Sequence, residues 1–175
     1  MIEVILVDKN DVQTGLMEKM EAHRKGLLHR AFSVFVFNKK GDFLLQQRSP
    51  SKYHSPGLWT NTCCSHPLPG EDVSQAANRR LSEEMGFTTN LSHAFSFVYR
   101  ATFDNELTEH EYDHVFTGVY EGKIEPDKNE VKDYCYKSIR DIEAGLQINP
   151  GQYTEWFRLA FPQIKEVHDK YFNSK

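Results

Sequence analysis

The sequence predicts an α/β (α+β) fold in which a mixed β-sheet is flanked by helices, built as a single domain over residues 1–175. Three observations favour this class. The chain is long enough to bury one substantial core. The expected strands and helices follow one another in mixed order, and two of the strands are joined by a short turn. Hydrophobic residues make up 39% and charged residues 26%, which is the balance of an ordinary globular protein.

The first part of the chain predicts three strands and one helix. Residues 30–38 are rich in Phe and Val, which is typical of a strand buried on both faces. The polar run that follows reads Lys-Lys-Gly-Asp and predicts a hairpin turn. In order, we expect a strand at 3–8, a polar turn at 10–15, a helix at 16–26, a strand at 30–38, a turn at 39–42 and a strand at 43–48.

A loop is expected at 49–70, and a second series of elements follows it. The loop holds a Trp, two cysteines, two histidines and several prolines, and a loop of this length inside a compact domain is usually functional. Gly86 is a typical helix end. We expect a helix at 71–85, strands at 96–103, 109–121 and 132–137, a capped helix start at 138–141 and an amphipathic helix at 154–172.

Charge and cysteine content exclude several classes of function. The formal net charge of −4 gives no overall attraction to nucleic acid or to an anionic membrane, so neither is predicted as a partner. No apolar run reaches the about 18 residues of a membrane span, and the start of the chain does not resemble a signal peptide. The three cysteines are odd in number and two are adjacent, which favours reduced thiols in the cytoplasm.

The helix expected at 71–85 carries regularly spaced charges. Ser65 is followed after five residues by Glu71, and after seven more by the run RRLSEEMGF at 79–87. Taken alone, Arg79 with Glu83 and Arg80 with Glu84 indicate exposed ion pairs worth about 0.3–0.5 kcal/mol each.

The complete spacing resembles the Nudix signature, which places Gly, then Glu, then Arg-Glu-aliphatic-X-Glu-Glu-X-Gly at these intervals. Ser65 and Arg80 depart from it, where the signature has Gly and Glu.

The resemblance implies a Nudix-like fold, here with a helix that binds a diphosphate through Mg²⁺. Magnesium prefers oxygen ligands and bridges carboxylates to phosphates, and Glu84 is the expected carboxylate. Nudix hydrolases concentrate carboxylates at this helix to hold several metals and activate water. Arg80 removes one such ligand and adds a partner for phosphate. The helix is therefore expected to bind a diphosphate rather than to hydrolyse it.

The segment 61–67, which reads NTCCSHP, resembles the cysteine motif of type I isopentenyl diphosphate isomerases, Asn-Ser/Thr-X-Cys-X-His-Pro. The resemblance extends from about residue 4 to residue 156. Its further matches are Glu18-Lys19, Ala22-His23, the run 28–33, Arg48, Lys52, the run 56–60, the run 99–101, the run 109–111 and Trp156.

This resemblance implies the isomerisation of isopentenyl diphosphate to dimethylallyl diphosphate through a tertiary carbocation, in isoprenoid biosynthesis. Moving the double bond requires one group to protonate an alkene carbon and another to remove a proton elsewhere, each within close reach of its carbon. The family uses a cysteine and a glutamate on opposite faces of the hydrocarbon, which carries onto Cys64 and Glu111. Cys63 sits at the variable position of the motif and is expected to be a small buried hydrophobe.

Two aromatic residues also receive roles from the resemblance. Trp156 matches the family tryptophan that offers its ring face to the carbocation, an attraction worth about 0.5–2 kcal/mol. Tyr99 matches the tyrosine that hydrogen-bonds the glutamate. Taken alone, a tryptophan on a helix is more often a core residue.

A second metal site is implied by three histidines and two glutamates. The two glutamates are two residues apart, so their side chains point to the same side of a strand. Nitrogen and carboxylate ligands together suit Mn²⁺ or Zn²⁺ better than Ca²⁺. The predicted ligands are His23, His29, His66, Glu109 and Glu111. The remaining histidines are expected to be solvent-facing or structural: His54, His93, His110, His114 and His168.

Four cationic residues are expected to bind the diphosphate, because Arg and Lys suit phosphate oxygens. They are Lys19, Arg48, Lys52 and Arg80. Two alternatives remain open at this point. A Nudix-type nucleotide diphosphohydrolase explains the helix but leaves Cys64 and the two glutamates without a role. A catalytically silent metal- or phosphate-binding module would lack the acid and the base.

Overall fold

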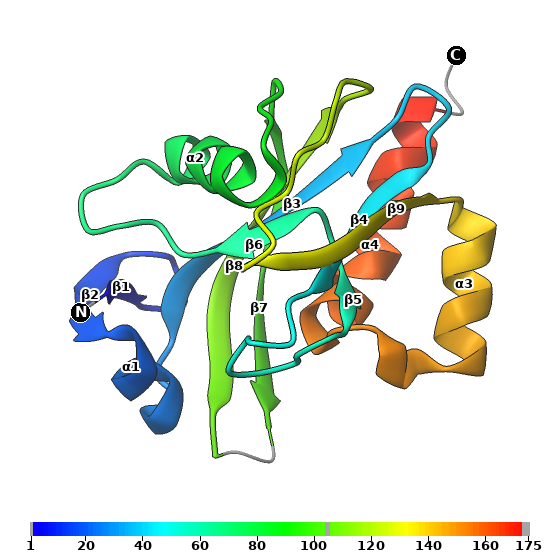
Figure 1. Cartoon of the computed structure of the whole chain (residues 1–175). Helices are drawn as coiled ribbons and strands as arrows, with labels where there is room; N and C mark the ends of the chain where they lie inside the picture. Colours follow the sequence, from blue (N-terminus) through cyan, green and yellow to red (C-terminus); the bar gives the residue numbers. More distant parts are fainter. Residues whose placement is uncertain (1, 104–105, 173–175) are drawn as a thin grey trace.

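The computed structural model describes residues 2–103 and 106–172. Within these residues, nine strands form one mixed sheet (Figure 1). The strands are β1 (Glu3–Val7), β2 (Gln13–Glu18), β3 (His29–Phe37), β4 (Phe43–Arg48), β5 (Trp59–Thr60), β6 (Cys63–Ser65), β7 (Ser92–Thr102), β8 (Thr108–Val119) and β9 (Val131–Lys137). The α-helices are α1 (Lys19–Lys25), α2 (Val73–Met85), α3 (Ile139–Ile148) and α4 (Glu155–Phe172).

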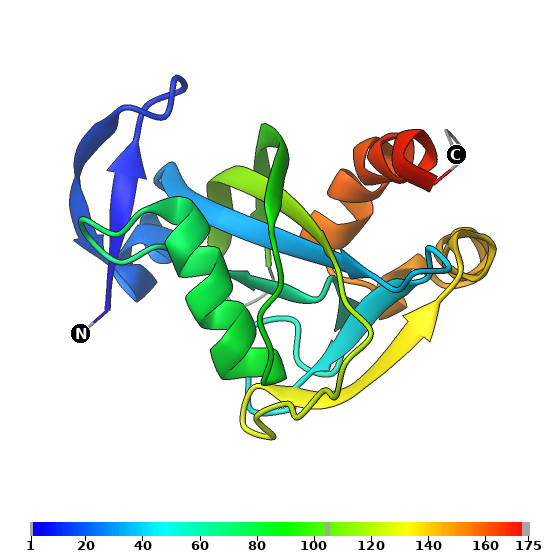
Figure 2. The same cartoon turned by 90° about the horizontal axis from the view of Figure 1, so that it is seen from above.

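Strand β3 is the centre of the sheet. It pairs in parallel with β8 and antiparallel with β1, β4 and β6. Its side chains alternate between two cores, with Val34 and Val36 on one face and Phe35 and Phe37 on the other. The sheet lies between α2 and α4 (Figure 2), which confirms the predicted helix-flanked sheet and the strand buried on both faces.

Helix α2 covers one face of the sheet with four wholly buried side chains: Ala76, Ala77, Leu81 and Met85. Asp72 caps its start, because its side chain accepts the N–H of Gln75. Gly86 ends the helix with a positive φ of 74°, and a Cβ atom there would lie 2.3 Å from the carbonyl oxygen of Glu125. Glycine is therefore required at this position, as the sequence indicated.

Helix α4 covers the opposite face with Phe157, Phe161 and Ile164, which pack with Phe35 and Phe43. Helix α3 precedes it and begins where predicted, since the Ser138 side chain accepts the N–H of Asp141. The start of α4 lies beside β5, where the N–H of Thr154 donates to the Trp59 carbonyl at 3.0 Å.

The structure corrects the prediction near the N-terminus. Residues 10–15 are not all turn and 16–26 are not all helix, because β2 occupies Gln13–Glu18 and pairs with β1 along its whole length. The turn is shorter, and Asp8 closes it by accepting the N–H groups of Asn10 and Val12. Helix α1 starts only at Lys19, where the Glu18 side chain accepts the N–H groups of Met20 and Glu21.

Two further boundaries differ from the prediction. The loop at 49–70 contains β5 and β6, which are short because each pairs with only a few residues of β4 or β3. Strand β7 begins at Ser92 rather than at residue 96, since its pairing with β8 continues through a bulge at His93–Phe95. Within the described residues, no helix is long and apolar enough to cross a membrane.

Candidate active site

One cavity collects side chains from both halves of the chain. It is lined by residues from α1, β3, β4, β6, α2, β7, β8 and α4, and from the loops that follow β4 and β6. All of the predicted site residues line it except His23 and His29, which are fully buried and contact His66. The structure therefore brings together residues that lie up to 137 positions apart in the sequence, from Lys19 to Trp156.

Cys64 and Glu111 reach this cavity from the two strands that flank β3. Cys64 lies on β6, opposite Ser33, and Glu111 lies on β8, next to His29. Successive residues of a strand point to opposite faces, so Cys63 turns away from the cavity into the core under α2. Cys63 is fully buried there, in the position of a small hydrophobe.

The thiol of Cys64 is in an environment that keeps it protonated. Burial raises its pKa above the ordinary value, and the carboxylates of Glu84, Glu109 and Glu111 add to the effect. The guanidinium of Arg48 opposes this rise without cancelling it. At neutral pH the cavity therefore holds a thiol with its proton in place.

Glu111 is surrounded by hydrogen-bond donors. Its Oε1 lies 2.9 Å from His66 Nε2 and 3.5 Å from His29 Nε2, and its Oε2 accepts the hydroxyl of Tyr99 at 2.7 Å. Burial by itself raises the pKa of this carboxyl, but the contacts with His29 and His66 outweigh burial and lower the pKa well below the ordinary value. Glu111 is therefore a carboxylate, opposite in protonation state to Cys64.

Glu109 points to the same side of β8 but has different neighbours. Its Oε1 lies 3.0 Å from His54 Nε2, and the Tyr99 hydroxyl lies 3.0 Å from its Oε2. Burial and the charge of Glu111 raise the pKa of Glu109. The two carboxyls thus share Tyr99, as expected for glutamates two residues apart on a strand.

Four of the five predicted ligands of the tight metal form a compact cluster. One ligand atom each from His23, His29, His66 and Glu111 lie within 4.8 Å of one another. The structure does not place Glu109 in this cluster, because its carboxyl faces His54 and Tyr99.

The cluster has the chemistry of a metal site. His23 Nδ1 donates to the carbonyl of Lys19 at 2.7 Å, and its buried Nε2 has no partner among the described residues. His29 Nδ1 likewise faces a backbone carbonyl, that of Leu27, at 2.8 Å. Such backbone contacts orient ligating imidazoles and leave the other nitrogen free for an ion. The donor set fits a divalent cation.

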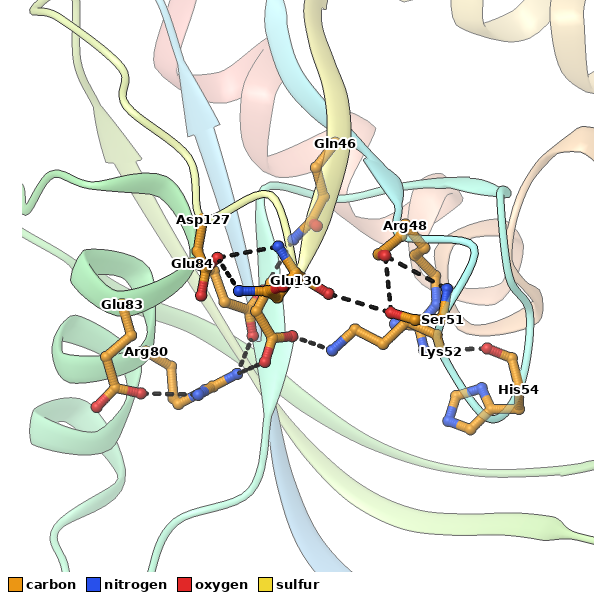
Figure 3. Close-up of polar contacts among 12 residues, drawn as sticks. Gln46, Arg48, Ser51, Lys52, His54, Arg80, Glu83, Glu84, Asp127 and Glu130 are labelled. Carbon is orange, nitrogen blue, oxygen red and sulfur yellow. Dashed lines mark hydrogen bonds and ion pairs between the residues drawn. The ribbon is translucent and has the colours of Figure 1, made fainter.

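A second group of charged side chains also lines the cavity, and Figure 3 shows the contacts among them. Arg80 Nη2 contacts Glu84 Oε1 at 2.6 Å, and Glu84 Oε2 also accepts the side-chain amide of Gln46 at 3.0 Å. The Nε atoms of Arg80 and Arg48 are buried and have no hydrogen-bond partner among the described residues. Buried unpaired N–H groups are rare in proteins, and a guanidinium N–H can donate to an anion.

The remaining cations lie nearby. Lys52, on the loop after β4, is paired with Glu130, and Lys19 Nζ lies 5.2 Å from the ring centroid of Tyr53. All four cations predicted for the diphosphate therefore line one cavity together with Glu84. The predicted pairs Arg79–Glu83 and Arg80–Glu84 both exist, but only the second involves a buried carboxylate.

Comparison with known proteins decides between the families that share this fold. The NUDIX domain model matches residues 27–157. Isopentenyl-diphosphate Delta-isomerase of Pectobacterium atrosepticum is 52% identical over 94% of this chain and 92% of its own length. The enzyme of that name from Photobacterium profundum is 51% identical over 93% and 91%, and enzyme 1 of Aromatoleum aromaticum is 47% identical over 93% and 92%. The chain belongs to the isopentenyl-diphosphate Delta-isomerase family.

Solved Nudix structures show the same fold at low sequence identity. A Deinococcus radiodurans protein superposes with a TM-score of 0.71 at 18% identity, over 84% of this chain and 90% of its own. The MutT protein of Methanosarcina mazei gives 0.65 at 23% identity, over 85% and 96%. These likenesses confirm the predicted Nudix-like architecture of this isomerase-family chain.

Four residues that line the cavity were not predicted for the site: Ser33, Tyr53, His54 and Ser65. His54 is only 6% exposed, lines the cavity, stacks on Phe103 with ring centroids 5.3 Å apart and meets the Trp156 ring edge-on at 5.6 Å. Of the two expectations for this histidine, solvent-facing or structural, its burial contradicts the first. Its position two residues after Lys52, in a loop already assigned to function, was the available signal. The histidines outside the cavity pair with other partners, such as His168 with the carbonyl of Gly41 and His114 with Asp11.

Proposed function

We propose that this isomerase-family protein converts isopentenyl diphosphate to dimethylallyl diphosphate with Cys64 and Glu111 as the proton-transferring pair. One observation carries the proposal. A protonated thiol and an ionised carboxylate reach one cavity from the two strands on either side of β3. A reaction that adds a proton at one carbon and removes one at another needs this complementarity of states.

The proton transfers balance between the two groups. The thiol of Cys64 gives its proton to the terminal methylene of the alkene, which leaves a tertiary cation at the next carbon. The carboxylate of Glu111 then removes a proton from the carbon on the diphosphate side, and the double bond forms there. After one turnover Cys64 is a thiolate and Glu111 is protonated, so before the next turnover the thiolate takes up a proton from water and Glu111 releases one. The hydroxyl of Tyr99, at 2.7 Å from Glu111, provides the contact through which this proton leaves.

We further propose that Trp156 stabilises the cation. Its ring lines the cavity, is 3% exposed and already has the guanidinium of Arg48 over it at 5.1 Å from the centroid. An aromatic face attracts positive charge more strongly where water is excluded. The ring therefore supplies electron density to the cation without offering it a base.

Two metals complete the proposal. Four cations would bind the diphosphate: Lys19, Arg48, Lys52 and Arg80. Glu84 would hold the Mg²⁺ that accompanies it. A Mn²⁺ or Zn²⁺ ion held by His23, His29, His66 and Glu111 would fix the Glu111 carboxylate and tune its acidity. We keep Glu109 as a candidate fifth ligand, which would have to turn away from His54 to join the cluster. Helix α1 contributes Lys19 to the cavity and His23 to the metal cluster. This supports our proposal that residues 1–175 act as one domain.

Hydrolysis of nucleotide diphosphates is the alternative that the fold allows. At α2, Arg80 contacts both Glu83 and Glu84, so a cation occupies the place where several carboxylates would gather metals. This arrangement supports diphosphate binding rather than water activation.

The three cysteines are free, which supports our further proposal of a reducing, cytoplasmic location. We propose no nucleic-acid or membrane partner.

Proton NMR of isopentenyl diphosphate with the protein and Mg²⁺ in D₂O tests the proposal. The expected result is dimethylallyl diphosphate that carries deuterium, because the protein acids exchange with solvent between turnovers. Unchanged substrate would rule the isomerase out. Release of phosphate from nucleotide diphosphates, measured in parallel, would instead favour the hydrolase.

A further inference from the structure

Glu130 lies between the two chain segments that carry the diphosphate-binding cations. It is the residue before β9, and its carbonyl accepts the N–H of Ser49 at 3.0 Å, at the start of the loop that holds Lys52. Three residues earlier, the N–H of Asp127 donates to the carbonyl of Glu84 on α2 at 3.0 Å. The segment 127–130 is thus hydrogen-bonded through its backbone both to α2 and to the start of the loop after β4.

The carboxylate of Glu130 contacts one cation on α2 and one on the loop after β4 (Figure 3). Its Oε2 is paired with Lys52 Nζ, and its Oε1 lies 3.5 Å from Arg80 Nη2. Its side chain is 26% exposed. Burial raises the pKa of this carboxyl, but the contacts with Lys52 and Arg80 outweigh burial and lower it, so the group is ionised.

Glu130 acts from outside the cavity. Lys52, Arg80 and Glu84 line the cavity, and Glu130 is not among its lining residues. Its pairing with Arg80 leaves the buried Nε of Arg80 without a partner. The carboxylate therefore fixes where the two cations stand without using up the donor that a bound anion needs.

We propose that Glu130 is a positioning residue that makes the diphosphate subsite select a magnesium–diphosphate complex over the free diphosphate anion. The inference rests on the proposed function, because it takes this cavity to be the diphosphate site. Neither the family resemblance nor the signature of α2 assigns a role to Glu130.

The physical reason is the charge balance around the ligand. Four cations and three carboxylates line the cavity, but among the described residues only Glu84 of these carboxylates forms an ion pair with one of the four cations, Arg80. The positive charge that is left favours a free anion and disfavours a divalent cation. Glu130 lowers the net positive charge beside Lys52 and Arg80, so a Mg²⁺ ion can approach together with the diphosphate. It also holds the ammonium and the guanidinium toward one point, so that both can bind the same ligand.

Binding of inorganic diphosphate, measured by calorimetry with and without Mg²⁺, tests this role on protein that retains its tight ion. The deciding quantity is the ratio of the diphosphate affinity with Mg²⁺ to the diphosphate affinity without it. In Glu130→Gln, and equally in Glu130→Ala, the enhancement by Mg²⁺ should fall by about tenfold, the scale of one charged hydrogen bond. Glu130→Asp keeps the charge and should retain the enhancement to within about threefold.

Glu83→Gln is the matched control, because Glu83 also contacts Arg80, at 2.7 Å from Nη1, but from the exposed side of α2. It should leave the ratio unchanged. If both affinities of the Glu130 variants fall equally, or neither changes, Glu130 is only a structural or a surface ion pair and the inference is overturned. A wild-type protein whose binding ignores Mg²⁺ would overturn it as well.

The same experiments separate this inference from the proposed function. If the wild-type protein isomerises the substrate and Glu130→Gln leaves the ratio of the two diphosphate affinities unchanged, only the role of Glu130 is overturned. If the wild-type protein does not isomerise the substrate, but Glu130→Gln loses the enhancement of diphosphate binding by Mg²⁺, the proposed function is overturned. The role of Glu130 then stands.

Discussion

The indole N–H of Trp156 donates to Oδ1 of Asn61 at 3.1 Å, and both side chains are buried. The amide of Asn61 in turn donates to the carbonyls of Cys63 at 2.6 Å and Val34 at 3.2 Å. One asparagine thus fixes the ring on α4 relative to the strand pair that carries Cys64. The aromatic face and the thiol are held by the same network, as their proposed cooperation on one substrate requires.

Trp156 should discriminate a cation from a neutral alkene. We predict that an ammonium analogue of the diphosphate, charged where the carbocation forms, binds far more tightly than the substrate, because the site complements the cationic intermediate. Trp156→Leu should weaken binding of the analogue more than binding of the substrate, by about 1–2 kcal/mol of differential free energy. Titration of both ligands against both proteins measures this difference, and diphosphate contacts cancel.

Trp59→Leu is the control for this comparison. Trp59 lies on β5, and its ring has Lys137 Nζ at 5.6 Å from the centroid, but it does not line the cavity. Its replacement should leave the differential near zero. Equal losses for the two ligands in Trp156→Leu would mean that Trp156 only shapes the cavity.

The two adjacent cysteines should respond differently to substitution. Cys64→Ala should lower kcat by about 10²–10⁴-fold, the usual contribution of a positioned acid or base. Cys63→Ala should keep most of the activity, because its thiol points into the core under α2, and should lower the free energy of unfolding by about 1 kcal/mol through the small cavity it creates. Steady-state kinetics and denaturant unfolding of both variants check this. The opposite order of activity loss would reverse the assignment.

The sequence predicted the fold class, but it did not predict every element that presents the proposed site. Cys64, Glu111 and the four cations could be proposed because they stand at positions that match the motifs of the isomerase family, and the structure places all of them in one cavity. Strand β2 could not be predicted, because its pairing depends on the open edge of β1 and its own residues do not alternate cleanly between polar and apolar.

His54 was missed for a related reason. Its role comes from a contact with Glu109, 55 positions later in the chain, and from stacking on Phe103. Neither leaves a local pattern in the sequence. The opposite orientations of Cys63 and Cys64 needed only the alternation of a strand, but that strand, β6, is three residues long and lay inside an expected loop.

The histidine cluster should hold one ion tightly. We predict that purified wild-type protein carries about one equivalent of a transition metal and that His66→Ala loses it, because His66 contributes one of four mutually close ligand atoms. Elemental analysis after gel filtration gives the content. His93→Ala removes an exposed histidine outside the cluster and should retain the ion. A full equivalent in His66→Ala would contradict the site.

His54 should make the stability of the metal-free protein depend on pH. Burial and the neighbouring Arg48 lower the pKa of His54 to about 3, against an ordinary value of 6.5. Below pH 6.5 the unfolded chain therefore binds a proton that the folded chain refuses, so this histidine makes folding less favourable as the pH falls toward 3. Between pH 5 and 6 its contribution to the free energy of unfolding should change by up to about 1.4 kcal/mol per pH unit.

His54→Phe keeps a ring that can stack on Phe103 but cannot bind the proton, so the slope of stability against pH should become shallower by about that amount. Urea unfolding of chelator-treated protein at several pH values measures both slopes. His29, whose pKa is raised by Glu111 against the effect of burial, acts at higher pH and is common to both proteins. His93→Phe, at an exposed position, should match the wild-type slope. An unchanged slope in His54→Phe would show that His54 is charged in the folded protein, and its pairing with Glu109 would then be a buried ion pair.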